Sequence, residues 1–201
     1  MNDVVIVRTG VANLASVLAG LRRLGVTPEV TTDPIAVRDA RAVILPGVGA
    51  FGAGMAALHE HGVAAPLTER AAAGRPLLSV CLGLQLLASS SDETPGVPGL
   101  GVFDAHVGRF PNTVKVPQLG WNRVVPDAGC ALLEPGYAYF ANSYRLAEGP
   151  AGWAAARSEH GGSFVAAIER GPQLSCQFHP ELSGPWGLAL LDRWLAVARE
   201  A

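Results

Sequence analysis

Short apolar segments alternate with helical patterns along the first half of the chain. Strand-length segments at 3–8, around Val30, at 42–46 and at 75–80 are separated or followed by helix-prone segments at 14–24, 53–73 and 82–88. We expect the 53–73 segment to break near Gly62 and Pro66, and Gly25 to end the first helix. A β-α-β-α order favours a parallel sheet covered by helices.

The second half of the chain has a different pattern. Its strand candidates are short and separated by turns, at 102–107, 137–144, 164–168 and 174–178. They favour an antiparallel extension of the sheet. Ser183 as a cap and Pro185 in an early helical position predict a closing helix. We therefore expect one α/β domain over residues 1–201, with a mixed, largely parallel central sheet flanked by helices.

Composition narrows the class of protein. Hydrophobic residues make up 49% of the chain and charged residues 16%, which argues against disorder. A net charge of -2 argues against a broad nucleic-acid surface. The apolar segments are shorter than the roughly 20 residues of a membrane helix, and the first residues lack a signal-peptide pattern. We expect a cytoplasmic protein that binds neither nucleic acid nor membrane.

The three cysteines, Cys81, Cys130 and Cys176, predict neither a disulfide framework nor a zinc site, because no two have metal-like spacing. No metal or cofactor is expected. Cys130 and Cys176 are expected to be buried as small hydrophobic residues. Cys81 differs because of the residues around it.

Cys81 lies in the segment Ser79-Val-Cys81-Leu-Gly83, between an apolar strand and an apolar helical pattern. This is the thiol version of a nucleophile elbow, a sharp turn at which only small flanking residues fit. The turn leaves the sulfur at a helix N-terminus, where the thiolate is favoured. The alternative is a buried cysteine at the end of a strand.

A second motif is Gln177-Phe-His179-Pro-Glu181, which follows an apolar strand. A carboxylate that accepts from one imidazole nitrogen orients the ring, and the other nitrogen is then free to exchange protons with a nucleophile. His179 and Cys81 are far apart in sequence and can meet only through the fold. The alternative is a packed histidine at the end of a strand.

A third motif is Pro46-Gly-Val-Gly49-Ala-Phe-Gly52, which follows a strand. Glycines let the backbone approach a ligand and present N–H groups to it. A phosphate-binding loop is one interpretation, but the Gly-Lys-Ser/Thr ending is missing. A loop that stabilises an oxyanion is favoured, because acyl transfer at Cys81 needs such donors.

Together these motifs resemble the class I glutamine amidotransferase family, and the chain is most similar to the glutaminase subunits of imidazole glycerol phosphate synthases. The stretches that carry the resemblance are Pro46-Gly-Val-Gly-Ala-Phe51, Cys81-Leu-Gly-Leu-Gln85, Lys115-Val-Pro-Gln-Leu-Gly-Trp-Asn122 and Gln177-Phe-His-Pro-Glu-Leu-Ser183. Many glutaminases share the elbow and His-Pro-Glu. The Gly-Trp-Asn and Pro-Gly-Val-Gly blocks are typical of this subunit.

The resemblance implies a flavodoxin-like fold and a cofactor-free glutaminase with Cys81, His179 and Glu181 as its triad. Cys81 would attack glutamine to form a thioester. The ammonia released would pass to a cyclase subunit, the partner in a heterodimer of histidine biosynthesis.

The resemblance also implies a glutamine pocket and an oxyanion hole. The expected pocket residues are Gly49, Gln85, Glu93, Asn142, Ser143 and Tyr144. Glu93 suits the α-ammonium group, and the segment 142–144 suits the α-carboxylate. The amides of Val48 and Leu82 would form the oxyanion hole, and that of Val48 would reorient when the partner binds its ligand.

The expected partner surface includes Asn13, Gln118, Trp121 and Asn122, with Trp121 as an aromatic anchor. A helix cap is an equal alternative for Asn13.

The sequence departs from the family pattern at several positions outside the triad. Ser79 replaces a frequent glycine but is still small enough for an elbow. Gln118 and Asn142 stand where many members have histidine. Leu182 replaces a common lysine, and Arg8 replaces a frequent acidic residue.

Three other functions are alternatives to this one. A glutaminase of another pathway would share the triad but lack the Gly-Trp-Asn block. A binding module of the same fold would have lost the chemistry, against which the intact triad speaks. A thiol esterase or peptidase is disfavoured because Gln85 and Glu93 suit a free amino acid.

Overall fold

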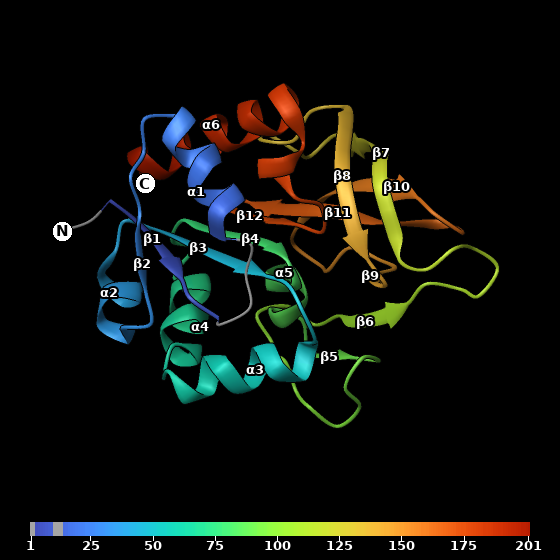
Figure 1. The fold of residues 1–201 in the computed structure, drawn as a ribbon, viewed down its shortest axis with the longest axis horizontal. Coiled ribbons are helices and arrows are strands. Elements are labelled where there is room, and N and C mark those ends of the chain that lie inside the picture. The colour runs from blue at the N-terminus through green and yellow to red at the C-terminus, as the bar shows by residue number, and fades with distance from the viewer. Residues whose placement is uncertain (1–2, 10–13) are drawn as a thin grey trace.

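A nine-stranded sheet forms the centre of the protein in a computed structural model that describes residues 3–9 and 14–201 (Figure 1). Its strand order is β2-β1-β3-β4-β12-β11-β10-β7-β8. The parallel strands are β1 (Val4–Val7), β2 (Glu29–Thr31), β3 (Ala42–Gly47), β4 (Leu77–Cys81) and β12 (Gln173–Cys176). The antiparallel strands are β7 (Gln118–Pro126), β8 (Gly136–Asn142), β10 (Ala154–Glu159) and β11 (Ser163–Arg170). The predicted mixed sheet with an antiparallel extension is confirmed.

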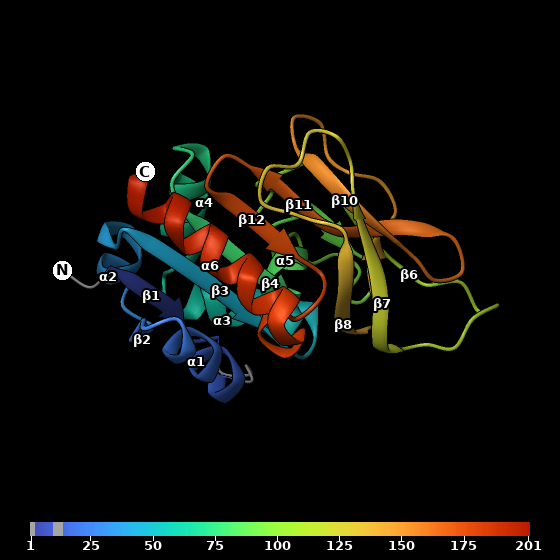
Figure 2. The ribbon, with the colours of Figure 1, turned by 90° about the horizontal axis from the view of Figure 1, so that it is seen from above.

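Helices cover both faces of the parallel strands. One layer contains α1 (Leu14–Arg23) and α6 (Gly184–Glu200), and the other contains α2 (Pro34–Asp39), α3 (Phe51–Glu60) and α4 (Ala64–Ala72) (Figure 1). Successive residues of β1 face opposite layers, so its side chains divide between two hydrophobic clusters. Figure 2 shows α6 lying across β3, β4 and β12, with β7 and β8 at the far end of the sheet.

A small second sheet and two short helical segments complete the fold. A second sheet has the order β5-β6-β9 and contains β5 (Ser90–Ser91), β6 (His106–Arg109) and β9 (Tyr144–Leu146). The helix α5 (Leu82–Leu86) follows β4 directly, and the 3-10 turn η1 (Pro180–Leu182) lies between β12 and α6. Both of these short helical segments follow a strand end at one edge of the sheet.

The structure corrects several details of the sequence prediction. The chain breaks between α3 and α4 at Gly62 as expected, whereas Pro66 lies in the first turn of α4, where its missing N–H costs nothing. The predicted strand 102–107 begins only at residue 106, and the predicted strand 137–144 is divided into β8 and β9. The elements α2, β7 and β10 were not predicted.

Within the ranges that the structure describes, no helix is both long enough and apolar enough to cross a membrane.

Candidate active site

Three neighbouring parallel strands end at one edge of the sheet. Gly47 at the end of β3 is in register with Cys81 at the end of β4, and Cys176 at the end of β12 is in register with Val80. Ligands of α/β proteins bind at such carboxyl ends. The pairing therefore brings the loop 46–52, the cysteine and the segment 177–181 together.

The backbone at Cys81 has the geometry of a nucleophile elbow. Its φ of 54° and ψ of -111° make it the one non-glycine residue of positive φ within 3–9 and 14–201. A Cβ atom at Gly83 would collide with the carbonyl oxygen of Leu45, and one at Gly47 would lie 2.8 Å from the amide nitrogen of Gly83. The positive φ of Cys81 is a strained backbone conformation, and the close packing of Gly47 and Gly83 holds it in place.

Ser79 fits the elbow in place of the family's frequent glycine. It is buried, and its Oγ lies 2.6 Å from Oγ of Ser175 on the paired strand β12. The two hydroxyls satisfy each other between the strands, so this departure leaves the turn intact.

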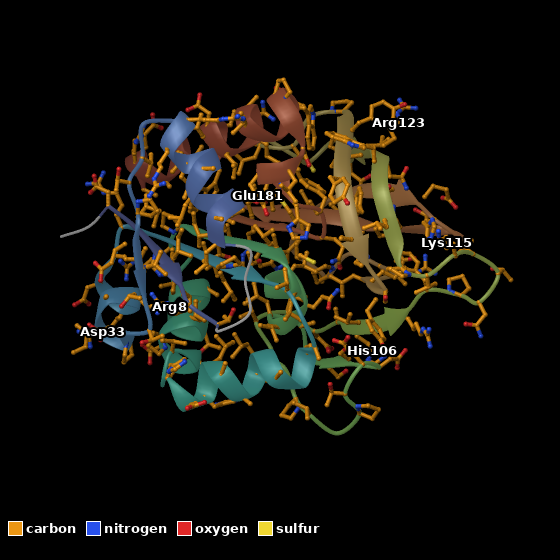
Figure 3. The ribbon with its side chains drawn as sticks, in the orientation of Figure 1. Arg8, Asp33, His106, Lys115, Arg123 and Glu181 are labelled. Atoms are coloured by element: carbon orange, nitrogen blue, oxygen red, sulfur yellow. The ribbon has the colours of Figure 1, made fainter. Side chains whose placement is uncertain are left out.

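His179 and Glu181 form a buried pair beside the elbow. Nδ1 of His179 lies 2.9 Å from Oε1 of Glu181, and their side chains are 7% and 3% exposed. Figure 3 shows Glu181 in the interior of the view, beside α1 and below α6, whereas Arg123 and Lys115 are at the periphery. Because Glu181 is bonded to Nδ1 of His179, Nε2 of the same ring is available to Cys81.

The pKa of His179 is governed by burial and by its two partners. Burial alone would lower it, but hydrogen bonds with Cys81 and Glu181, together with their negative charges, outweigh that effect and raise the pKa to about 10. The imidazolium is therefore the favoured form at neutral pH. This charge state suits a paired thiolate.

Ser183 and Tyr139 fix the backbone of His179. The amide nitrogen of His179 donates to the carbonyl oxygen of Tyr139 at 2.9 Å. The hydroxyl of Ser183 donates to the carbonyl oxygen of His179 at 2.6 Å and accepts from the amide nitrogen of Tyr139 at 3.0 Å. Ser183 stands at the cap position of α6, but its side chain makes no capping bond there, contrary to the sequence prediction.

A pocket of about 320 Å³ opens next to the cysteine. Its lining contains the predicted triad members Cys81 and His179, the predicted oxyanion residues and all six predicted glutamine-binding residues. The full lining is Val48, Gly49, Cys81, Leu82, Gln85, Glu93, Ala141, Asn142, Ser143, Tyr144 and His179. The structure thus brings together residues from five separate parts of the sequence.

The pocket wall is held by side-chain contacts to backbone. Oε2 of Glu93 accepts from the amide nitrogen of Phe51 at 2.6 Å, at the start of α3. The side-chain nitrogens of Gln85 and Asn142 both donate to the carbonyl oxygen of Tyr144, at 3.2 and 2.9 Å. These bonds set the position of the wall before any ligand is bound.

Gln177 was not recognised as a site residue from the sequence. It is fully buried, and its Nε2 lies 3.8 Å from Sγ of Cys81. It directly follows β12, the strand paired with β4, and its place two residues before His179 was the available signal.

The four predicted partner-surface residues are placed differently from one another. Trp121 is 58% exposed, whereas Gln118 is buried because alternate residues of β7 face opposite sides. Nδ2 of Asn122 donates to the carbonyl oxygen of Glu159 at 2.8 Å. Asn13 lies outside the described residues.

The other two cysteines lie away from the pocket. Cys176 is buried in the core as expected, and burial raises its pKa well above the usual range. Cys130 is only partly buried, against the expectation, and burial raises its pKa to about 11. Residues 3–9 and 14–201 contain no group of three His, Cys, Asp or Glu side chains arranged to hold a metal ion.

Known proteins resemble this chain over almost its whole length. The family profile "Glutamine amidotransferase class-I" matches residues 6–197. Subunit HisH of imidazole glycerol phosphate synthase from Symbiobacterium thermophilum is 42% identical over 198 residues, which cover 96% of this chain and 93% of that protein. The subunit of the same name from Moorella thermoacetica is 42% identical over 205 residues, covering 100% and 98%.

A solved structure described as a glutamine amidotransferase has the same fold. Its TM-score is 0.78 at 21% identity, with 97% of this chain and 98% of that chain covered. The profile and the relatives cover the elbow, the His-Pro-Glu segment and the pocket. This chain belongs to the class I glutamine amidotransferase family.

Proposed function

We propose that this protein is the glutaminase subunit of an imidazole glycerol phosphate synthase. It hydrolyses glutamine to glutamate and ammonia and passes the ammonia to a cyclase subunit in histidine biosynthesis, as one domain over residues 1–201. Relatives of that name at 42% identity over nearly the full length support the assignment. The cytoplasm is the proposed location.

The observation that carries the chemistry is the meeting of Cys81 and His179 in one pocket, with Glu181 bonded to the histidine. The thiolate of Cys81 attacks the carboxamide carbon of glutamine. As the carbon–nitrogen bond breaks, His179 gives its proton to the departing ammonia and a glutamyl thioester remains. Glu181 holds the ring through Nδ1 in this step.

The second half of the reaction restores the enzyme. Neutral His179 takes a proton from water, and the hydroxide attacks the thioester carbonyl. The carbon–sulfur bond breaks, glutamate leaves, and the Cys81 thiolate faces the His179 imidazolium again. One water is consumed, and one glutamate and one ammonia are formed.

The lining of the pocket suits a free amino acid. The carboxylate of Glu93 is the proposed partner for the α-ammonium group of glutamine, and the segment 142–144, which lines the same pocket, is the proposed partner for its α-carboxylate. The amides of Val48 and Leu82, two residues that line the same pocket as Cys81, are the proposed oxyanion donors. Gly49, with a φ of 99°, gives the Val48 loop the backbone freedom that a reorientation needs.

The proposed cyclase contact is an exposed apolar surface next to the His-Pro-Glu segment. Leu119, Trp121 and Tyr137 lie on the outward face of β7 and β8, and Leu182 follows Glu181 directly. A Cβ atom on Gly184 would lie 3.7 Å from the ring of Trp121, so the tryptophan lies beside the turn into α6. Docking there would put the partner within a few residues of the catalytic histidine.

Covalent labelling tests the chemistry without a partner. A diazoketone analogue of glutamine should alkylate Cys81, and excess glutamine should protect it. The Cys81→Ala variant is the control for labelling elsewhere. Labelling of Cys130 instead, or no protection by glutamine, would contradict the assignment.

A further inference from the structure

Gln177 connects the reacting cysteine to the wall of the pocket. Its Nε2 lies 3.8 Å from Sγ of Cys81, and its Oε1 accepts from Nε2 of Gln85 at 3.0 Å. Its backbone is fixed by a 2.8 Å bond from its amide nitrogen to the carbonyl oxygen of Ala166. The side chain is fully buried but does not line the pocket.

The orientation of the Gln177 amide follows from its neighbours. The carbonyl oxygen of Tyr144 can only accept, so the end of Gln85 that lies 3.2 Å from it must be the NH2 group. The same NH2 group faces Gln177, which must therefore present its oxygen to Gln85. The NH2 end of Gln177 is left facing the sulfur of Cys81. Turning the Gln85 amide over would place its oxygen against the oxygens of Tyr144 and Gln177, and turning the Gln177 amide over would place two NH2 groups against each other.

A buried N–H donor beside a sulfur favours the charged form of that sulfur. Hydrogen bonds to an ionised group stabilise it, and more strongly where water is excluded. The titratable groups around Cys81 are His179, Glu181 behind it, and Glu93 in the same pocket. Gln177 adds a neutral donor, which stabilises a thiolate without competing for its proton.

We propose that Gln177 stabilises and positions the Cys81 thiolate, and that Gln85 is the positioning residue that fixes the Gln177 amide. The consequence for turnover rests on the proposed glutaminase function. Because Gln177 does not line the pocket, its loss should lower kcat and leave KM for glutamine nearly unchanged. A merely structural role would not move the ionisation of the sulfur.

The test is the pH dependence of Cys81 alkylation by iodoacetamide, followed on the Cys81 peptide by mass spectrometry. In Gln177→Met, alkylation at pH 7 should be about tenfold slower, with the same plateau rate at high pH. In the isosteric Gln177→Glu, the added negative charge should move the midpoint further toward high pH.

Gln173→Met is the matched control. Gln173 is a buried glutamine on β12 whose Nε2 donates to the carbonyl oxygen of Ala71 at 2.7 Å, at the end of the strand away from Cys81. Its alkylation profile should equal that of the unchanged protein. A wild-type profile in whichever Gln177 variant folds, judged by a cooperative thermal transition, would overturn the proposal. Alkylation needs neither glutamine nor cyclase, so this outcome is distinct from a failure of the glutaminase assignment.

Discussion

The carboxylate of Glu181 lies 2.9 Å from Nδ1 of His179, and both side chains are almost fully buried. A buried pair of this kind is sensitive to the loss of either member, because the other charge is left without compensation. The glycine at position 20 in α1 lies against Glu181, where an added Cβ would be 3.5 Å from its Cβ. Glu181, the acid that we propose orients His179, thus contacts both the histidine and the helix α1.

The Glu181→Gln variant should lose most of its turnover. An amide keeps the shape of the carboxylate but neither stabilises the imidazolium nor selects the right ring tautomer, so we expect kcat to fall roughly 10²–10⁴-fold. Steady-state glutamate release with the cyclase present measures this. A kcat within twofold of the unchanged protein would show that Glu181 does not orient His179 during catalysis.

Stability should depend on pH through His179. Its pKa rises from an ordinary value of 6.5 to about 10 in the folded protein, so the folded state holds a proton that the unfolded state releases between these values. This contribution is fully present below about pH 6.5 and is lost as the pH rises through about 10. Urea unfolding of the protein and of His179→Gln should show free energies of unfolding that converge across that range. A constant difference would contradict the raised pKa.

The Gly83→Ala substitution should damage the elbow. The new methyl group would collide with the carbonyl oxygen of Leu45, so β3 or α5 must shift. We expect a loss of about 1–3 kcal/mol in the free energy of unfolding and slower labelling of Cys81 by the glutamine analogue.

Gly129→Ala is the control for a glycine replacement in general. An added Cβ there would make an ordinary 3.4 Å contact with Ala154, in an exposed turn. Its stability and labelling should match those of the unchanged protein. Equal behaviour of the two variants would argue against a tightly packed elbow.

The Trp121→Ala substitution should weaken binding to the cyclase. Trp121 is the large aromatic residue on the exposed face of β7, and truncation of such an anchor costs about 2 kcal/mol, or more than tenfold in Kd. Calorimetry with the purified cyclase measures it. Val125→Ala, on the same face of the strand but further from Leu182, is the control and should change Kd little. An unchanged Kd for the Trp121→Ala variant would show that the cyclase binds elsewhere on this protein.

Local motifs made the elbow predictable from the sequence. Cys81 and Gly83 stand between a strand pattern and a helix pattern, and the small residue at 83 is required by the carbonyl oxygen of Leu45 on the neighbouring strand β3. The pocket residues, in contrast, could be predicted only from the resemblance to a family. Nothing in the spacing of Glu93 or Asn142 indicates that they face the same cavity.

Other features depend on pairing across the sheet and could not be predicted. Gln177 faces Cys81 only because β12 pairs with β4, and Gln118 is buried because of the side that β7 turns inward. The strand β7 was missed because its outward apolar residues, such as Leu119 and Trp121, face solvent rather than the core. The sequence of one chain does not show directly that an apolar face, such as the one we assign to the cyclase, is covered by a partner.

The most direct test is glutamate release from glutamine by the purified chain, alone and then with the cyclase subunit and its ribulosyl ligand. The proposed function predicts a low rate for the chain alone and a sharp rise in the complete mixture, with Cys81→Ala inactive throughout. The cyclase must first be shown to work with added ammonium salt. No glutamate release in either condition, with that cyclase active on ammonia, would contradict the assignment of this chain as its glutaminase.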